Sequence, residues 1–338
     1  MRQRPLLALM MFSALCTFLP SAAFATPASS EPQAVREWLM RIHEAASRRN
    51  FLGTFVVSAA GAVSSARIAH FCEGPNQFER IDTLDGQTRH VFRYNELVHT
   101  LWPHARVAVV EQRELVKSFP ALLQDGDDRI GEFYDVSPAG MDRVAGHEAS
   151  VLIVRPKDGY RFGYRLWSEK DTGLLLRADV LGEKGELLET SAFSDVAIDV
   201  RAQPEAVLQP MRRLDGYRIV RPRFTTTRLE AEGWALRQAV PGFRQVRSVK
   251  RPLDGFGDAD PPATGTAEAL QTIFSDGLTY VSVFIEPYDS GRHPRPMVRT
   301  LGATQTLMRR QGDWWITVVG DVPVVTLKAF AGGLERRK

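Results

Sequence analysis

Residues 275–287 read SDGLTYVSVFIEP, and this stretch decides the fold class of the second half of the chain. Val281, Val283 and Ile285 fall on one side of an extended chain, and the other side is apolar with polar interruptions. A hydrophobic period of two indicates a β-strand, and the Asp276–Gly277 pair indicates a tight turn before it. We therefore expect the central strand of a sheet, with these three β-branched residues in its core.

The residues around this strand predict a small α+β domain of about five strands. Apolar alternation recurs in GWALRQAVPGFRQVRSVKR (233–251), LQTIFSDG (270–277) and TLMRRQGDWWITVVG (306–320). A basic loop at 288–298 follows the central strand, and residues 252–267 form a Gly- and Pro-rich loop that we expect to be mobile. A closing helix is expected from Pro323, because proline suits the first turn of a helix.

The first half predicts one helix followed by an antiparallel meander. Residues 33–50 place Trp38, Leu39 and Ile42 on one helical face. Short alternating stretches follow, and their short connections imply antiparallel neighbours. The expected strands are FLGTFVVSA (51–59), ARIAHFCE (66–73), QFERIDTL (77–84), RHVFRYN (89–95), LVHTLWP (97–103), ARVAVVEQ (105–112), ASVLIVRP (149–156), YRFGYRLWS (160–168), LLLRADVLG (174–182) and ELLETSAFSDVAID (186–199). About ten strands with few helices predict a strongly curved sheet or an open barrel.

The expected fold class is therefore α+β, mainly antiparallel β, in two domains. Residues 201–217 hold two prolines and lack strand alternation, so we expect a linker there. The predicted boundaries are 26–200 for the N-terminal domain, 218–332 for the C-terminal domain and 333–338 for a basic tail.

Residues 1–25 have the features of a secretory signal peptide. Arg2 and Arg4 give a positive start, an apolar run follows, and Ala23-Phe24-Ala25 is a small-x-small cleavage site. We expect cleavage near Ala25 and a mature protein outside the cytoplasm. Lipidation at Cys16 fits less well, because the residue before it is leucine and not a small residue.

The charge of the chain is divided between its halves. Residues 211–338 carry 20 Lys and Arg against 13 Asp and Glu, whereas residues 26–210 carry 21 against 27. Such asymmetry concerns binding partners. A secreted protein rarely meets nucleic acid, so the anions expected to face the basic half are lipid headgroups, lipopolysaccharide phosphates and acidic protein segments.

Motifs of catalysis and metal binding are incomplete in this sequence. His43-Glu44 begins a zinc-protease HExxH, but Ser47 stands at the last position, and residues 125–132 lack the acid and the glycine of a calcium loop. His99 and His104 could share a metal, although no third ligand is indicated. We expect a binding protein without metal or cofactor, with a hydrolase whose active site is assembled only in space as the alternative. Cys72 is expected to be a small buried hydrophobe, with a reactive thiol as the alternative.

Two groups of residues are candidates for binding. A concave apolar face in a half-open sheet can hold an acyl chain. Its candidate residues are Phe78, Phe92, Trp102, Phe133, Tyr164 and Trp167. Guanidinium groups gathered in a domain of excess positive charge favour an anion-binding face. Its candidate residues are Arg292, Arg295, Arg299, Arg309 and Arg310.

Long stretches of the chain together resemble the RseB/MucB family of periplasmic regulators of the envelope-stress sigma factor. In the second half the resemblance is carried by SDGLTYVSVFIEP and GWALRQAVPGF. In the first half it is carried by NFLGTFVVSAAG, RIAHF, ERIDTLDGQTRHVFR, SFPALL, DRVAGHEASVLIVRPKDGYRFGYRLW and DTGLLLRADVLGEKGELLE. The match covers nearly all of the chain after residue 25, and is loose only at 252–267 and in the tail LERRK.

The resemblance implies a first domain similar to the lipoprotein carriers LolA and LolB, a half-open barrel with a helical lid. It implies a periplasmic protein that binds the periplasmic part of a membrane anti-sigma factor (RseA or MucA) and blocks its site-1 proteolysis. The resemblance also implies displacement of the protein by lipopolysaccharide or mislocalised lipoprotein, and self-association. The alternative function is a periplasmic lipid or lipoprotein carrier that resembles LolA.

Overall fold

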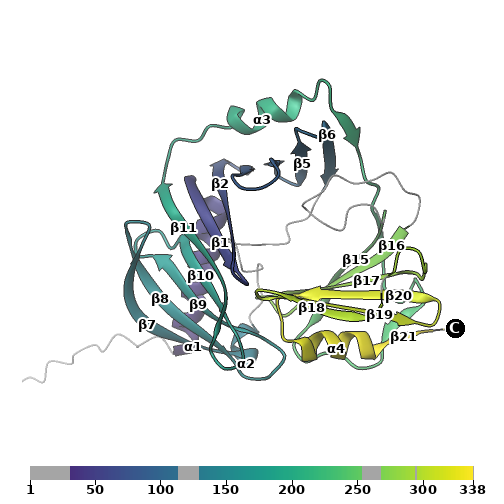
Figure 1. Ribbon diagram of the computed structural model, residues 1–338. Coiled ribbons are helices and arrows are strands. Elements are labelled where there is room, and N and C mark those ends of the chain that lie inside the picture. The colour runs from purple at the N-terminus through teal and green to yellow at the C-terminus, as the bar shows by residue number, and fades with distance from the viewer. Residues whose placement is uncertain (1–30, 113–128, 253–267, 294, 338) are drawn as a thin grey trace, which may run out of the picture.

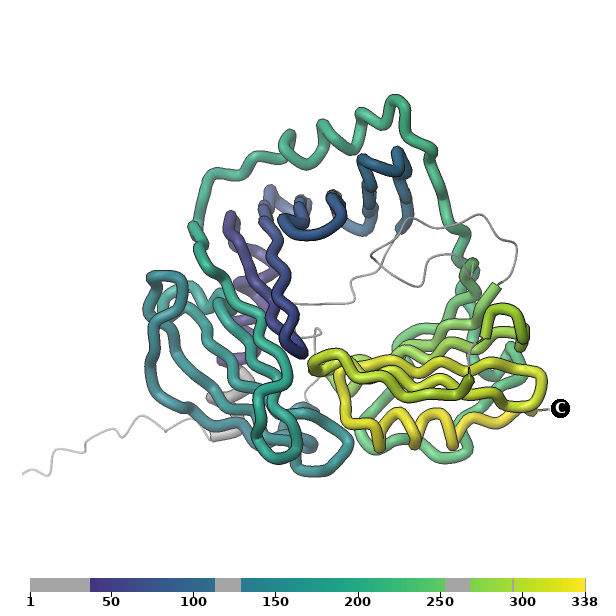
Figure 2. The backbone as a smooth tube through the Cα atoms, in the orientation of Figure 1, coloured from purple at the N-terminus to yellow at the C-terminus, as the bar shows by residue number. Residues whose placement is uncertain are grey.

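The chain folds into two β-rich domains (Figures 1 and 2). The computed structural model describes residues 31–112, 129–252, 268–293 and 295–337, and side chains from residue 37 onward. The expected signal segment 1–25 and most of the expected mobile loop at 252–267 lie outside the described residues, as does SFPALL. None of the helices in the described part of the chain combines the length and the apolar character that a bilayer crossing needs.

The first domain comprises a twelve-stranded sheet and three helices. Its elements are α1 (Glu31–Arg48), β1 (Phe51–Ala59), β2 (Ala62–Glu73), β3 (Asn76–Thr83), β4 (His90–Tyr94), β5 (Leu97–Trp102), β6 (Val107–Gln112), α2 (Ile130–Phe133), β7 (Tyr134–Val144), β8 (His147–Pro156), β9 (Gly163–Glu169), β10 (Leu175–Leu181), β11 (Leu187–Ile198), α3 (Glu205–Arg212) and β12 (Arg218–Val220). The strand order is β12-β6-β5-β4-β3-β2-β1-β11-β10-β9-β8-β7. All neighbours are antiparallel except β12 and β6, which confirms the expected meander.

Two helices cover opposite faces of this sheet. α1 places Leu39 and Ile42 in a core cluster with Tyr164 and Leu166. α3 packs Val207 and Met211 on the other face of the sheet, over a cluster that includes Phe71 and Phe78. The two edge strands β12 and β7 do not pair with each other in the described residues, so the sheet is open there, as the strand count suggested.

Several elements of the first domain differ from the sequence expectation. β12 pairs with β6 of the first sheet, although the C-terminal domain was expected to begin at residue 218. β7 was not expected, because Pro138 and Gly140 interrupt its alternation. As the edge strand of the sheet it tolerates a proline, and the register shifts between Pro138 and Met141. α3 lies inside the segment expected to be a linker, and Val207 is fully buried.

The second domain is built round residues 275–287, SDGLTYVSVFIEP. Its elements are β13 (Thr225–Thr227), β14 (Trp234–Leu236), β15 (Arg244–Pro252), β16 (Glu268–Ser275), β17 (Tyr280–Pro287), β18 (Met297–Leu301), β19 (Thr304–Gln311), β20 (Trp314–Gly320), α4 (Val324–Gly333) and β21 (Leu334–Arg336). A seven-stranded sheet has the order β13-β15-β16-β17-β20-β19-β18, so β17 is its central strand, as expected. β14 and β21 pair separately.

One face of the second sheet carries the core of the domain. Val281, Val283 and Ile285 are at most 2% exposed, and they share a cluster with Leu327 and Phe330 of α4. The opposite face, which we call the open face, carries the alternate residues of β17. In Figure 1 α4 lies below this sheet and the open face is turned toward the strands of the first domain.

Candidate functional site

The loop that follows β17 folds back over the open face of the second sheet. Glu286 lies on this face opposite Trp315 of β20. The ring of His293 stacks on Trp315 with centroids 4.9 Å apart, and Tyr288 stacks on His293 at 5.6 Å. Three aromatic side chains therefore fix residues 288–293 against the sheet.

Hydrogen bonds determine how this loop presents its charges. The backbone N–H of Asp289 donates to Nδ1 of His293 at 2.7 Å. Nδ1 is thus an acceptor and the ring proton lies on Nε2, which is 3.3 Å from a Glu286 carboxylate oxygen. The Asp289 carboxylate accepts the N–H of Gly291 at 2.8 Å, and this bond together with the nearby Arg292 guanidinium lowers the pKa of Asp289. Arg292 lies between Asp289, at 3.3 Å, and Glu286, at 3.5 Å.

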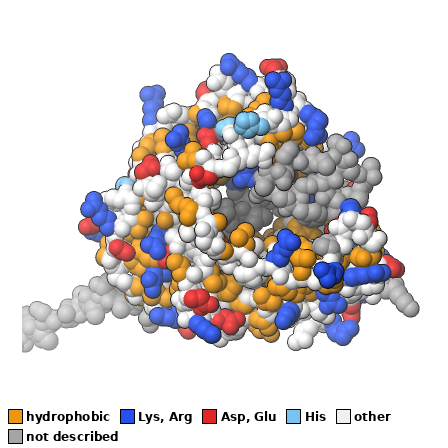
Figure 3. Space-filling model, viewed as in Figure 1, with side chains coloured by type: hydrophobic (Ala, Val, Ile, Leu, Met, Phe, Trp, Pro, Cys, Tyr) orange, Lys and Arg blue, Asp and Glu red, His pale blue; other side chains and the backbone are white. Residues whose placement is uncertain are grey.

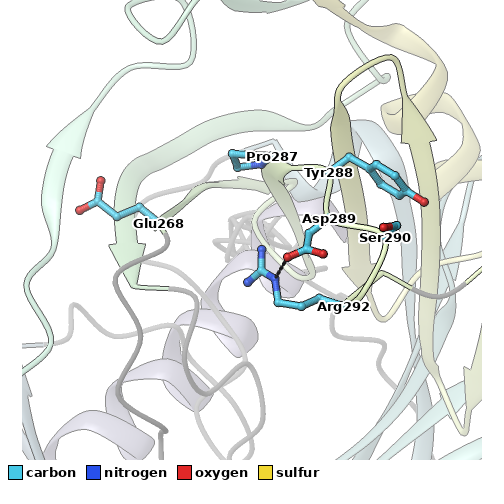
Figure 4. A pocket seen from close by; sticks show the side chains of 6 residues that line it. All are labelled: Glu268, Pro287, Tyr288, Asp289, Ser290 and Arg292. Atoms are coloured by element: carbon cyan, nitrogen blue, oxygen red, sulfur yellow. Dashed lines mark hydrogen bonds and ion pairs between the residues drawn. The ribbon is translucent and has the colours of Figure 1, made fainter.

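These residues border an open cavity of about 560 Å³. Its lining residues are Glu268, Pro287, Tyr288, Asp289, Ser290 and Arg292. Figure 4 shows Arg292 and Asp289 pointing toward each other, whereas Glu268, at the start of β16, lies apart from them with its carboxylate turned away. A guanidinium and two carboxylates at one opening offer both donors and acceptors, which suits a polypeptide better than a simple anion.

The predicted basic residues divide into distinct places. Arg292 lines the cavity, and the Arg310 guanidinium lies 3.9 Å from the centroid of the Tyr288 ring, so these two flank the same loop. Arg295 and Arg299 are exposed on the stretch leading into β18 and on β18 itself. Arg309 alternates with Arg310 and so lies on the α4 side of the sheet. In the space-filling view, several Lys and Arg side chains lie over the second domain (Figure 3). That these arginines bind a partner stays a prediction.

The predicted apolar-cavity residues are spread over several packed clusters. Phe78 and Phe92 share the cluster under α3, whereas Trp102 packs with Val107 and Val109. Tyr164 packs near α1 with Phe133 beside it, and Trp167 belongs to a further cluster. All but Phe133 are at most 5% exposed, and the structure does not bring the six round one cavity. Their role in holding an acyl chain stays a prediction.

A second cavity, of about 390 Å³, lies in the first domain on the α3 side of β1, β2, β3 and β11. It is lined by Leu52, Gly53, Thr54, Arg67, Ala69, Phe71, Arg80, Asp82, Asp195, Ala197, Gln203 and Ala206. Arg80 pairs with Asp82 at 2.8 Å and lies over the Phe92 ring at 5.5 Å. Sequence reasoning missed this site, although the alternation of Arg67, Ala69 and Phe71 on one strand face carries the signal.

The histidine and cysteine candidates can also be placed. His99 is buried on β5, whereas His104 is exposed in the turn after it, and no cluster of three metal-ligating side chains occurs in the described ranges. Cys72 is partly exposed, with its Sγ 3.4 Å from Nε2 of His70 and 3.1 Å from the Ser47 carbonyl oxygen. It is therefore less buried than expected.

Comparison with known proteins accounts for both domains. The profile of the MucB/RseB N-terminal domain matches residues 34–211, and that of the MucB/RseB C-terminal domain matches residues 228–335. The chain belongs to the MucB/RseB family. Its similarity to the sigma factor AlgU regulatory protein MucB of Pseudomonas aeruginosa is 30% identity over 324 residues, 93% of this chain and 94% of that protein. The sigma-E factor regulatory protein RseB of Haemophilus influenzae is 25% identical over 92% of this chain and 94% of its own.

Solved structures of this family have the same fold. A crystal structure described as MucB in complex with MucA(peri) has a TM-score of 0.63 and 27% identity, covering 90% of this chain and 99% of that one. The complex of Pseudomonas aeruginosa MucA/MucB has a TM-score of 0.66 at the same identity and coverage. The resemblance to the RseB/MucB family, read from the sequence, is thus confirmed. The named relatives are regulatory proteins, which agrees with the absence of a recognisable catalytic motif in the sequence.

Proposed function

We propose that this chain is a periplasmic negative regulator of an envelope-stress sigma factor, which acts by binding the periplasmic part of a membrane anti-sigma factor. The observation that carries the proposal is similarity over nine tenths of the chain to a MucB that was crystallised with MucA(peri). A protein with this role works by covering its partner and needs no nucleophile, so we further propose that it is not an enzyme.

The finer mechanism of the proposal is protection and release. The bound regulator shields the anti-sigma factor from the site-1 protease, and lipopolysaccharide or lipoprotein acyl chains displace the regulator. Displacement requires that the two ligands disfavour each other, and a coupling of about 1–3 kcal/mol gives a several-fold to about hundredfold loss of affinity. Self-association of the chain would compete with the same equilibrium.

The proposed partner surface is the basic part of the second domain around Arg292, Arg295 and Arg299. Binding of residues 26–338 to the periplasmic segment of the anti-sigma factor from the same genome is measured by calorimetry at moderate salt. Replacing the three arginines by Glu should weaken binding on the order of tenfold, because each change substitutes repulsion for attraction. The matched control replaces Arg48, Arg155 and Arg212, exposed arginines of the first domain, by Glu. Absence of any binding by the parent chain would refute the proposal, and equal affinities of both triple variants would remove the basic surface from it.

Release is tested on the preformed complex. Titration with lipopolysaccharide should dissociate it, whereas an unchanged complex at saturating lipopolysaccharide would remove this part of the mechanism.

A second candidate function is a lipid or lipoprotein carrier. The cavity of about 390 Å³ on the first domain, with Leu52, Ala69 and Phe71 among its lining residues, favours it. A carrier releases stoichiometric lipid on organic extraction of the purified protein, and a regulator without lipid does not. The same preparation can be examined by both experiments.

A further inference from the structure

A buried guanidinium lies where the two domains contact each other. Arg161 lies in the loop between β8 and β9 of the first domain, and its side chain is fully buried. An arginine is rarely buried in this way unless its guanidinium is paired with a carboxylate and its N–H groups find hydrogen-bond acceptors. The identity of those partners shows what the residue does.

Two of the three hydrogen-bond acceptors of Arg161 belong to the second domain. Nε donates to Oδ2 of Asp276 at 2.7 Å, and Nη2 donates to the carbonyl oxygen of Pro241 at 2.6 Å. Nη1 pairs with Asp158 on its own loop. The guanidinium therefore bonds both domains: Nη1 pairs within the first domain, and Nε and Nη2 donate to the second.

The Asp276 carboxylate also accepts hydrogen bonds from both domains. It is fully buried, and its Oδ1 accepts the backbone N–H groups of Leu278 and Thr279 at 3.0 and 2.9 Å within the β16–β17 turn. Its Oδ2 accepts the hydroxyl of Tyr134 at 2.8 Å, from the first domain. Burial and the neighbouring Asp276 charge raise the pKa of Tyr134 well above its usual value, so the phenol stays a donor. Arg161 and Asp276 thus each form hydrogen bonds within their own domain and with the other domain.

Apolar groups enclose this polar junction. The Arg161 guanidinium lies 4.5 Å from the centroid of Phe133 in the first domain and 5.1 Å from that of Phe243 in the second. Leu278 of the second domain is 5% exposed and belongs to the same core cluster as Leu39 and Ile42 of α1. A side chain at Gly242 would collide with Arg161, so the backbone there approaches the guanidinium closely. The side chains of Arg161 and Asp276 are themselves fully buried, so solvent does not readily replace the hydrogen bond between them.

A directional ion pair between two domains restricts their relative orientation more than an apolar contact does. Apolar surfaces slide over each other at small cost, whereas a buried guanidinium that bonds two acceptors of the other domain, Asp276 and Pro241, favours one relative orientation. Buried ion pairs contribute little net stability, since desolvation offsets their attraction, and specifying geometry is one role for which they are retained. We propose that Arg161 and Asp276 are positioning residues that fix the angle between the two domains.

The test measures the distance between the domains in the full chain. Spin labels are attached at Lys184→Cys in the first domain and Lys328→Cys in the second, both exposed, in a Cys72→Ser background. We expect one narrow distance distribution for the parent and a width about twofold greater or more for Arg161→Met, because relative domain motion is the default where the interface does not specify one geometry. Arg155→Met, which removes an exposed arginine from the neighbouring strand, should retain the narrow distribution.

A stability effect is separated from an orientation effect by a double variant. Arg161→Met alone leaves Asp276 as an unpaired buried charge and should lower the melting temperature. Arg161→Met with Asp276→Asn has no unpaired charge and keeps an acceptor for the turn, so its melting temperature should recover while its distance distribution stays broad. A parent-like distribution in the double variant would overturn the proposal. Because the double variant has no buried net charge, it supplies the same test if Arg161→Met does not fold.

Discussion

The ring of His293 stacks on that of Trp315 with centroids 4.9 Å apart, and Tyr288 contacts both rings, while Nε2 of His293 faces Glu286 at 3.3 Å. The histidine therefore connects the loop after β17 to the sheet by an aromatic contact and by a polar one. The side chain of His293 is 6% exposed and that of Glu286 is 9% exposed, so solvent replaces neither contact easily. The position of Arg292, which is tied to the same Glu286, depends on this histidine.

Replacing His293 by Ala should therefore loosen the loop and destabilise the second domain by about 1–2 kcal/mol, the sum of a lost aromatic contact and a lost buried hydrogen bond. Denaturant unfolding followed by tryptophan fluorescence measures the change, because Trp315 is the stacking partner. His104→Ala removes an exposed histidine and is the matched control. Equal midpoints for the two variants would show that the stack does not support the loop.

Val283→Asp should unfold the second domain. Val283 is fully buried at the centre of the sheet, where it lies opposite Thr272 of β16 and Val318 of β20. An unpaired carboxylate there costs more than about 4 kcal/mol, among the largest effects of single substitutions. Val298→Asp, on the edge strand β18 and 46% exposed, should leave the melting profile nearly unchanged. A cooperative transition for Val283→Asp at the parent temperature would contradict the assignment of the core face.

Local patterns were sufficient for the strands with regular alternation. β1 was predicted with its observed bounds, 51–59, and β17 with its core residues, because one face of each strand is continuously apolar. β7 was missed because an edge strand can carry Pro138 and Gly140 without breaking a central ladder. α3 was missed because its two prolines, Pro204 at the N-cap and Pro210 inside, are typical of a linker. The tertiary contacts of Val207 outweigh that local preference.

The contact between the domains could not be predicted from the sequence, for a different reason. Asp276 was read only as a turn residue, and that reading holds, since its Oδ1 accepts two N–H groups of the turn. Its second role requires Arg161, which is 115 residues away in the sequence, and no local period links them. The arginine candidates illustrate the same limit, because adjacent Arg309 and Arg310 were grouped although a strand sends them to opposite faces.

Gly53→Ala should destabilise the first domain, because a Cβ at this position would lie 2.6 Å from the carbonyl oxygen of Asp195 and 2.8 Å from the Phe193 ring. Both belong to β11, the neighbour of β1, so the collision falls within the sheet. Overpacking of this kind typically costs about 1–3 kcal/mol, which thermal or urea unfolding resolves. Gly131→Ala, where nothing lies within 4 Å, is the control. Similar stabilities of the two variants would mean that β1 and β11 are less closely packed than described.

The buried pair of His70 and Glu79 should make the stability of the first domain depend on pH. Nδ1 of His70 lies 3.5 Å from a Glu79 oxygen on the adjacent strand, and their side chains are 7% and 17% exposed. Burial acts to lower the pKa of His70, but the hydrogen bonds with Cys72 and Glu79 and the Glu79 charge outweigh it and raise the pKa to about 9. A pKa that is higher in the folded than in the unfolded protein means that the folded state binds the proton more tightly.

The stabilisation by His70 is then complete below pH 6.5, the usual histidine value, and is lost as pH rises through about 9. The shift from 6.5 corresponds to at most about 3 kcal/mol. The free energy of urea unfolding is measured for the parent and for His70→Gln at pH 6, 7.5 and 9.5. The stability difference between them should be largest at pH 6 and smallest at pH 9.5, because glutamine does not titrate and other groups cancel. His104→Gln, which changes an exposed histidine, should show no such trend. A difference that stays constant over this range would show that folding does not raise the pKa of the His70 imidazole.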